Sequence, residues 1–184
     1  GLGIFTPLGI VGAIFYIIHH ILVKSGLFLC AGVASEVLGS THLRRLGGLA
    51  KTNSGIGWIF LILALSLAGV PPFSGFFSKF VLIQAGMEAQ SWGIVIVSLV
   101  VSFLTLFSMM KIWRFAFWGT TPEGAKPITG SGYWKLLPPP AILALCTIVI
   151  GLNADFFLQY VNVAAEQLMH PEIYIDAVLG QQHF

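Results

Sequence analysis

Long apolar stretches, separated by short polar segments, dominate the hydropathy pattern of the chain. Four stretches stand out, at residues 7–38, 56–88, 92–116 and about 137–152. A helix that crosses a bilayer needs roughly 20 consecutive, mostly apolar residues, and the stretches reach or approach that length. We therefore expect an all-α, polytopic membrane protein with about four transmembrane spans.

Helix signals mark both ends of the first stretch. Thr6 followed by Pro7 is typical of a helix start, and Gly39 is a suitable stop. At 1.5 Å per residue the helix would be about 48 Å long, so it must tilt, bend or project from the bilayer.

A different periodicity follows the fourth stretch. Apolar residues recur at i, i+4, i+7 and i+11 on one side and polar residues lie on the other: Phe157, Val161, Ala164 and Leu168 against Gln159, Asn162 and Glu166. This pattern predicts an amphipathic helix that lies on the outer membrane surface or on a partner. We expect residues 1–152 to form a membrane domain and residues 153–184 an extracytoplasmic amphipathic tail.

The composition supports a membrane location. The chain is 57% hydrophobic and only 9% charged, whereas a soluble domain carries about 25% charged residues. Cys30 and Cys146 lie inside apolar runs, which argues against a disulfide framework. The chain begins with Gly1 and shows no signal peptide, and we expect it to be a fragment of a longer protein.

The distribution of basic residues predicts an orientation. Seven of the nine lysine and arginine residues lie in or beside two loops, at 40–53 and 111–136: Arg44, Arg45, Lys51, Lys111, Arg114, Lys126 and Lys135. Cytoplasmic loops carry an excess of such residues. We expect both loops to be cytoplasmic and the C-terminus to lie outside, which agrees with the number of spans.

The two remaining lysines lie inside apolar stretches. Lys24 is near the middle of the first stretch, and Lys79 follows the break in the second. A charged side chain at the centre of a bilayer costs on the order of 2.5–3.5 kcal/mol. Lys24 is too far from either helix end to snorkel easily, so both lysines are candidates for ion transport; the alternative is a paired, structural lysine.

Lys24 belongs to a polar stack. Tyr16, His20 and Lys24 are spaced i, i+4 and i+8 on one helix face, and His19 adjoins them. Imidazole exchanges protons near neutral pH, so the stack is a candidate proton relay; a polar stripe packed against a neighbouring helix explains it equally well. Haem ligation by His19 or His20 is disfavoured. It would need another histidine on the opposite face of the haem, and no further histidine lies inside an apolar stretch.

The second stretch is interrupted at Pro71-Pro72, within the segment 70–75. Each proline frees the carbonyl four residues earlier, here those of Leu67 and Ala68. Unpaired backbone is tolerated at membrane depth where it is buried in protein or lines a wet cavity, and broken helices mark transport sites. We expect a discontinuous helix here; a proline kink for packing is the alternative.

The segment after the two prolines adds two more candidates. We expect Ser74 to cap the second half-helix, with Gly75 beside it in the break, which places Lys79 about a turn and a half further along. A lysine near the positive end of a half-helix releases its proton more readily, as a proton carrier must.

Several motifs resemble the antiporter-like subunits that Mrp-type cation/proton antiporters share with respiratory complex I. The resemblance rests on His20-Ile-Leu-Val-Lys24 with the following 27–32, on Leu-Gly-Gly-Leu at 46–49, and on Leu-Ala-Gly-Val-Pro-Pro-Phe-Ser-Gly-Phe-Phe-Ser-Lys at 67–79. The segments 108–113, 117–119 and 174–180 are most similar to the D-type branch of the Mrp antiporter subunits. The likeness covers roughly residues 1–152.

The resemblance implies the C-terminal part of a fourteen-helix fold of two inverted repeats, in a multi-pass protein of the bacterial plasma membrane. It implies that Lys24 and His20 carry protons along a central axis and that Lys79 gates a half-channel, coupled to Na⁺ export. The implied partners are the other subunits of a hetero-oligomeric antiporter, lipid, H⁺ and Na⁺. The sequence contains no metal or nucleotide motif, and we expect no cofactor, no nucleic-acid partner and no covalent catalysis. Lys79 replaces a glutamate of some members, and Tyr16 a histidine.

Two other functions remain open. A proton-pumping subunit of a complex I-like NADH:quinone oxidoreductase would use nearly the same residues, driven by quinone reduction. A structural scaffold would use the polar residues only to hold helices together, and it predicts that Lys79→Ala keeps transport but reduces assembly.

Overall fold

The structure is a computed structural model, which describes residues 2–43, 46–120, 130–172, 175 and 178. Every regular element in this part is a helix, so the predicted all-α class is confirmed. The elements are η1 (Leu2–Ile4), α1 (Pro7–Leu38), α2 (Leu49–Thr52), α3 (Ser54–Ala68), α4 (Ser74–Glu88), α5 (Trp92–Ala116), α6 (Ser131–Leu136), α7 (Pro138–Leu152) and α8 (Ala154–Met169).

α1 follows its predicted bounds. The backbone N–H of Gly9 donates to the Thr6 hydroxyl over 3.0 Å, and Pro7 opens the helix. Gly39 ends it in a left-handed conformation, with φ 66°. α1 and α5 are each long and apolar enough to cross a membrane.

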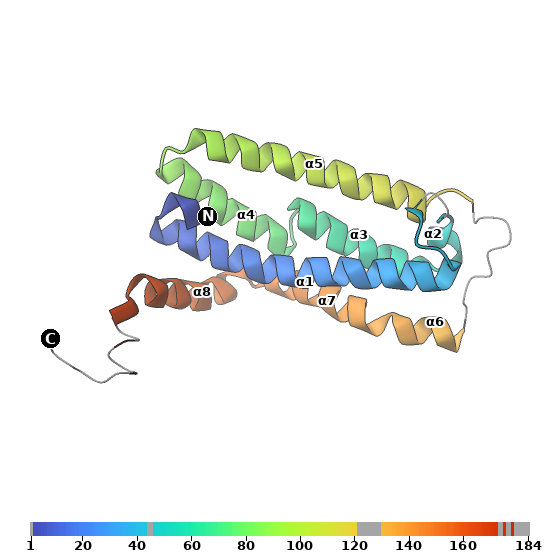
Figure 1. The fold of residues 1–184 in the computed structure, drawn as a ribbon. Helices are drawn as coiled ribbons and strands as arrows, with labels where there is room; N and C mark the ends of the chain where they lie inside the picture. Colours follow the sequence, from blue (N-terminus) through green and yellow to red (C-terminus); the bar gives the residue numbers. More distant parts are fainter. Residues whose placement is uncertain (1, 44–45, 121–129, 173–174, 176–177, 179–184) are drawn as a thin grey trace.

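The predicted break is also confirmed. α3 ends at Ala68 and α4 begins at Ser74, and the two helices lie end to end alongside α1, with α5 on their other side (Figure 1). α7 is short, as predicted, and α8 turns away from it by 87°. The stretch predicted as one discontinuous span is therefore two half-length helices in line.

α8 is the predicted amphipathic helix, and it packs on α1. Val161 is buried in a cluster that contains Val11 and Phe15 of α1. Leu168, on the same predicted apolar side, is 65% exposed, and its contact with the membrane surface or a partner stays a prediction. Ala165 is buried in the same cluster as Val161.

Two apolar clusters lie on either side of the break. On α1, Phe15 belongs to one cluster and Val23 to the other. On α7, Ile150 belongs to the cluster of Phe15 and Ala144 to the cluster of Val23. The polar residues that lie between these pairs along the two helices are therefore held from both sides by packed side chains.

The end of the bundle that carries α2 and α6 is closed by backbone and hydroxyl contacts. The N–H groups of Gly48 and Ala50 donate to carbonyls at the end of α5, and Gly48 has φ 73°. The Tyr133 hydroxyl accepts from the first turn of α3 at Ile56 N, over 3.0 Å. The positive φ of Gly48 and its backbone bond to the end of α5 explain the second glycine of the Leu-Gly-Gly-Leu motif.

Four of the basic residues used for the orientation are described: Lys51, Lys111, Arg114 and Lys135. They belong to α2, the last turns of α5, and α6, which share one end of the bundle (Figure 1). Arg44, Arg45 and Lys126 lie outside the described residues, as does most of the motif at 174–180.

Candidate functional site

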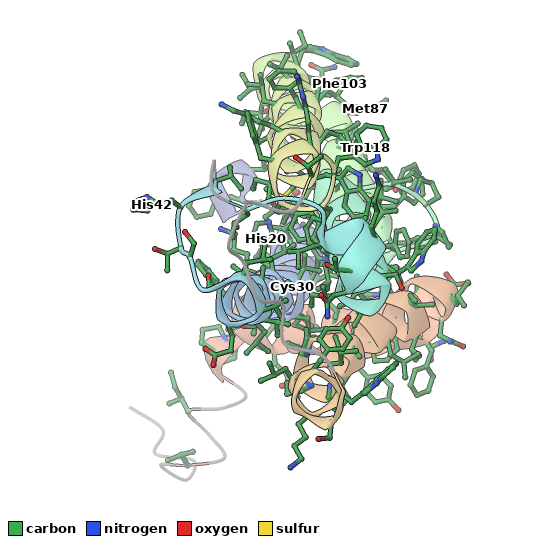
Figure 2. All side chains as sticks on the ribbon, turned by 90° about the vertical axis from the view of Figure 1, so that its right-hand side faces the viewer. His20, Cys30, His42, Met87, Phe103 and Trp118 are labelled. Carbon is green, nitrogen blue, oxygen red and sulfur yellow. The ribbon has the colours of Figure 1, made fainter. Side chains whose placement is uncertain are left out.

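A cavity of about 450 Å³ lies beside the break, between α1, α4 and α5. Its wall contains the predicted residues Tyr16, His20, Lys24 and Lys79. Figure 2, which looks along the helices, shows His20 in the middle of the bundle, between α1 and α5. The structure thus brings the α1 stack and the α4 lysine, predicted from separate motifs, to one cavity.

The α1 stack has the geometry that its spacing predicts. The rings of Tyr16 and His20 lie 4.2 Å apart between centroids, and Lys24 lines the same cavity one turn further on. His20 is within electrostatic reach of both Lys24 and Lys79. An imidazole between two amines and a phenol can exchange a proton in either direction.

Lys79 binds the backbone that the prolines set free. Its Nζ donates to the carbonyls of Leu67 and Ala68, at 2.9 Å each. Gly69 makes room for this arm: it has φ 91°, and an added Cβ would lie 2.9 Å from Lys79 Cδ. The charge-assisted bonds join the start of α4 to the end of α3.

Lys24 stands at a boundary between two environments. Besides the polar cavity, it borders an apolar cavity of about 370 Å³, together with Phe28, Phe60 and Met109. Its side chain is exposed. Within the described part of the chain, the one ion pair joins His170 and Glu172, so Lys24 has no acidic partner there.

His19 lies on the other side of the break and is completely buried. Its Nδ1 is 2.9 Å from the Ser74 hydroxyl. That hydroxyl is 2.6 Å from Thr147 Oγ1 on α7, which is 2.5 Å from Ser66 Oγ on α3. All four side chains have zero exposure. This hydroxyl chain (His19, Ser74, Thr147, Ser66) joins four helices.

The predicted role of Ser74 as a helix cap is wrong. Phe73 occupies the cap position and makes no side-chain cap. Ser74 is the first residue of α4, and its hydroxyl turns into the core because His19 and Thr147 offer partners there.

Two glycines allow the helices to meet at the hydroxyl chain. A Cβ on Gly75 would overlap the Ser66 carbonyl and would lie 2.8 Å from His19 Cε1. A Cβ on Gly151 of α7 would overlap the Pro72 carbonyl. The predicted break residues Pro71, Pro72 and Gly75 are thus part of a tight helix junction.

Sequence reasoning missed two sets of polar residues. Ser66 and Thr147 are single hydroxyls in apolar helices, and no spacing pattern links them. Ser98, Ser102 and Thr105 of α5 line the cavity, and their i, i+4, i+7 spacing on one face is a usable signal. Ser102 and Thr105 donate to carbonyls of their own helix, which leaves oxygen lone pairs available to the cavity.

Comparison with known proteins places these features in a family. Residues 1–105 match the family described as "NADH:quinone oxidoreductase/Mrp antiporter, TM". The chain is 50% identical to the D-type subunit of the Na⁺/H⁺ antiporter of Alkalihalophilus pseudofirmus and 42% identical to that of Bacillus subtilis, in each case over 98% of this chain and 36% of the relative. The chain thus spans little more than a third of these relatives.

A solved structure has the same fold. A chain in the structure of the Mrp complex from Dietzia sp. DQ12-45-1b matches 96% of this chain with a TM-score of 0.86 and 33% sequence identity, over 41% of its own length. The resemblance inferred from the motifs is therefore confirmed.

Proposed function

The chain belongs to the NADH:quinone oxidoreductase/Mrp antiporter transmembrane family, and from that membership we propose that it is a proton-translocating part of a subunit in a multisubunit Na⁺/H⁺ antiporter. Its partners would be the other subunits of the complex, the bilayer, H⁺ and Na⁺. Residues 1–152 would form the proton-conducting membrane domain, and residues 153–184 an extracytoplasmic tail.

The observation that carries the proposal is the shared cavity of Tyr16, His20, Lys24 and Lys79. A protonated Lys79 holds the α3 carbonyls, and a neutral amine binds them less strongly because the charge is lost. Transfer of its proton to His20, directly or through water, therefore loosens the junction between α3 and α4. Return of a proton restores it.

His20 and Lys24 carry the proton onward along α1 in this mechanism. Each passes a proton to the next group and regains one, so no charge accumulates on the stack. Tyr16, stacked on His20, extends the path by its hydroxyl. His19 is the remaining proton-exchanging group of the mechanism, on the buried side of the break. General acid–base groups of this kind act best when they exchange protons near the working pH.

The orientation follows from the positive-inside rule. The described basic residues at the α2 and α6 end would face the cytoplasm of a bacterium, and α8 would lie near the opposite surface of the plasma membrane. Exposed Trp118 and Trp134 at the basic end fit an interfacial belt.

A redox-driven pump is the nearest rival because the family includes quinone oxidoreductases. The relatives named above are antiporter subunits, which favours exchange with Na⁺. Purification of the intact complex separates the two: an antiporter carries no iron–sulfur subunits and works without NADH.

The test uses the full-length protein in its complex, in everted membrane vesicles. Lys24→Ala and Lys79→Ala are each expected to abolish the Na⁺-driven pH change while the complex still assembles. Wild-type exchange in both variants would refute the proton-carrier assignment. Loss of assembly with normal exchange per complex would instead support the scaffold role.

A further inference from the structure

Three cavities follow one another along α1, from the break toward the end of the bundle that carries α2. The polar cavity of about 450 Å³ shares Lys24 and Leu67 with the apolar cavity of about 370 Å³. The apolar cavity in turn shares Ala31, Phe60 and Ile112 with a third cavity of about 230 Å³. Cavities with common wall residues are neighbours, so the three form one row.

The row ends at the surface. Ser35 and Thr41 belong to the wall of the third cavity, and they also line a surface depression with Glu36 and His42, where α1 ends. This is the end of the bundle at which α2 lies and basic residues gather (Figure 1). The cavities therefore outline a route between the lysines at the break and the basic end.

The middle of this route is apolar. Among the described residues in the wall of the 370 Å³ cavity, Lys24 alone is polar, and it stands at the boundary to the polar cavity. The rest of the wall includes Phe28, Phe60, Leu67 and Met109. A buried water needs about two to four polar partners, and a cavity lined by apolar side chains stays dry. A proton therefore meets an interruption of the hydrogen-bonded path here.

This apolar section is long on the scale of a proton transfer. Lys24 and Ser35, polar α1 residues of the two neighbouring cavities, are separated by about 16 Å along the helix at 1.5 Å per residue. A hydrogen bond spans only about 3 Å, so a proton can cross the section only along a chain of water molecules. Channels use apolar constrictions of this kind as gates, which are closed while they hold no water.

One wall of the section is fixed and the other is free to move. Phe60 is buried, and its ring centroid lies 4.8 Å from that of Phe117 and 6.2 Å from that of Trp113. Phe28 is 78% exposed. Met109 is only partly buried, and methionine is a flexible side chain. Movement of Phe28 and Met109 against the aromatic wall would therefore admit water.

Leu67 connects the section to the break. Its side chain borders both the polar and the apolar cavity, and its carbonyl accepts a hydrogen bond from Lys79 Nζ over 2.9 Å. A charged Lys79 thus holds the residue that separates the two cavities. A neutral amine holds it less firmly, because the charge no longer assists the bond.

We propose that the apolar section is a gate between the break and the basic end, and that Lys79 controls it through the Leu67 carbonyl. The gate residues are Phe28, Phe60, Leu67 and Met109. With Lys79 charged, the gate is dry and closed. Loss of the proton loosens the end of α3 and admits water, and a proton that enters from the basic end recharges Lys79 and closes the gate. The control by Lys79 rests on the proposed function, whereas the gate itself does not.

The direct test is the reaction of single cysteines in everted vesicles that contain the full-length complex without its native cysteines. Ser35→Cys lies on the surface side of the gate, and Ser102→Cys lines the polar cavity behind it. The membrane-impermeant reagent sulfonatoethyl methanethiosulfonate, added on the cytoplasmic side, is expected to label Ser35→Cys quickly and Ser102→Cys slowly. Equal rates, or no reaction at Ser35→Cys, would overturn the gate.

Two adjacent methionines test the gate residues. Met109→Ser adds a hydroxyl to the gate and should raise the labelling rate of Ser102→Cys about threefold to tenfold, the factor that one hydrogen bond contributes. Met110→Ser is the matched control, because Met110 is the next residue of α5 but is not part of the cavity wall. If Met109→Ser does not assemble, Phe28→Ser serves instead, since this side chain is largely exposed. Equal rates in the gate and control variants would contradict the proposal.

Variants of Lys79 test the control. Lys79→Ala frees the Leu67 carbonyl and should raise the labelling rate of Ser102→Cys about threefold to tenfold, whereas Lys79→Arg keeps a charged donor and should leave it unchanged. An unchanged rate in Lys79→Ala would refute the control by Lys79.

None of these rates depends on Na⁺ or on proton flux. The gate can therefore fail while Lys24→Ala and Lys79→Ala still abolish exchange, and it can be confirmed even if both variants exchange normally.

Discussion

The two sides of the break between α3 and α4 differ in chemistry although they join the same helices. On the cavity side, one charged amine binds two backbone carbonyls. On the core side, neutral hydroxyls and an imidazole form the link, without exposure. In the proposed mechanism the cavity-side link weakens when Lys79 loses its charge, whereas the bonds between the core-side hydroxyls carry no charge. One link can therefore change while the junction persists.

The largest expected effect comes from fixing the charge on the cavity side. Lys79→Arg keeps the donors but cannot release a proton in a protein. We expect Na⁺-driven proton flux to fall about a hundredfold or more, the range that a general acid–base group contributes, with normal assembly. Flux is measured in everted vesicles and divided by the amount of complex. Substantial flux in this variant would mean that Lys79 supplies only a positive charge.

A steric change on the core side is expected to act on stability instead. Gly151→Ala places a methyl group on the Pro72 carbonyl, and overpacking of this kind costs typically about 1–3 kcal/mol. We expect less complex in the membrane and a lower thermal midpoint in detergent. Gly93→Ala on α5 is the control, since a Cβ there meets nothing within 4 Å. Equal yields for the two variants would contradict the tight junction.

The smallest expected effect concerns the end of the α1 stack. Tyr16→Phe keeps the ring on His20 and removes the hydroxyl. We expect a loss of about threefold in flux, as for one hydrogen bond, and Tyr16→His, which restores a group that can exchange a proton, should retain more flux than Tyr16→Phe. Full activity of Tyr16→Phe would remove the hydroxyl from the path.

Local signals in the sequence predict the cavity side of the break but not the core side. The ends of α1, the break at Pro71-Pro72 and the stack of Tyr16, His20 and Lys24 all follow from spacing, proline chemistry or cost of charge. They are properties of one helix at a time, and the structure reproduces them.

The core side depends on contacts between helices that are distant in the chain. Thr147 meets Ser74 and Ser66 across separations of 73 and 81 residues, and no periodicity marks an isolated hydroxyl in an apolar helix. The cap expected at Ser74 is wrong for the same reason: its local pattern fits a helix start, and the tertiary partners that divert its hydroxyl are invisible in the sequence.

The central claim is that Lys79 must lose and regain a proton at the break. The most direct test places cysteine at position 79 of the full-length protein, with Cys30, Cys146 and any other cysteines replaced, and restores a side chain chemically in vesicles. Aminoethylation creates a lysine-like amine that can release a proton and should recover Na⁺-driven proton flux, whereas a trimethylammonium-ethyl group carries a permanent charge and should not. Equal recovery with both reagents would contradict the account.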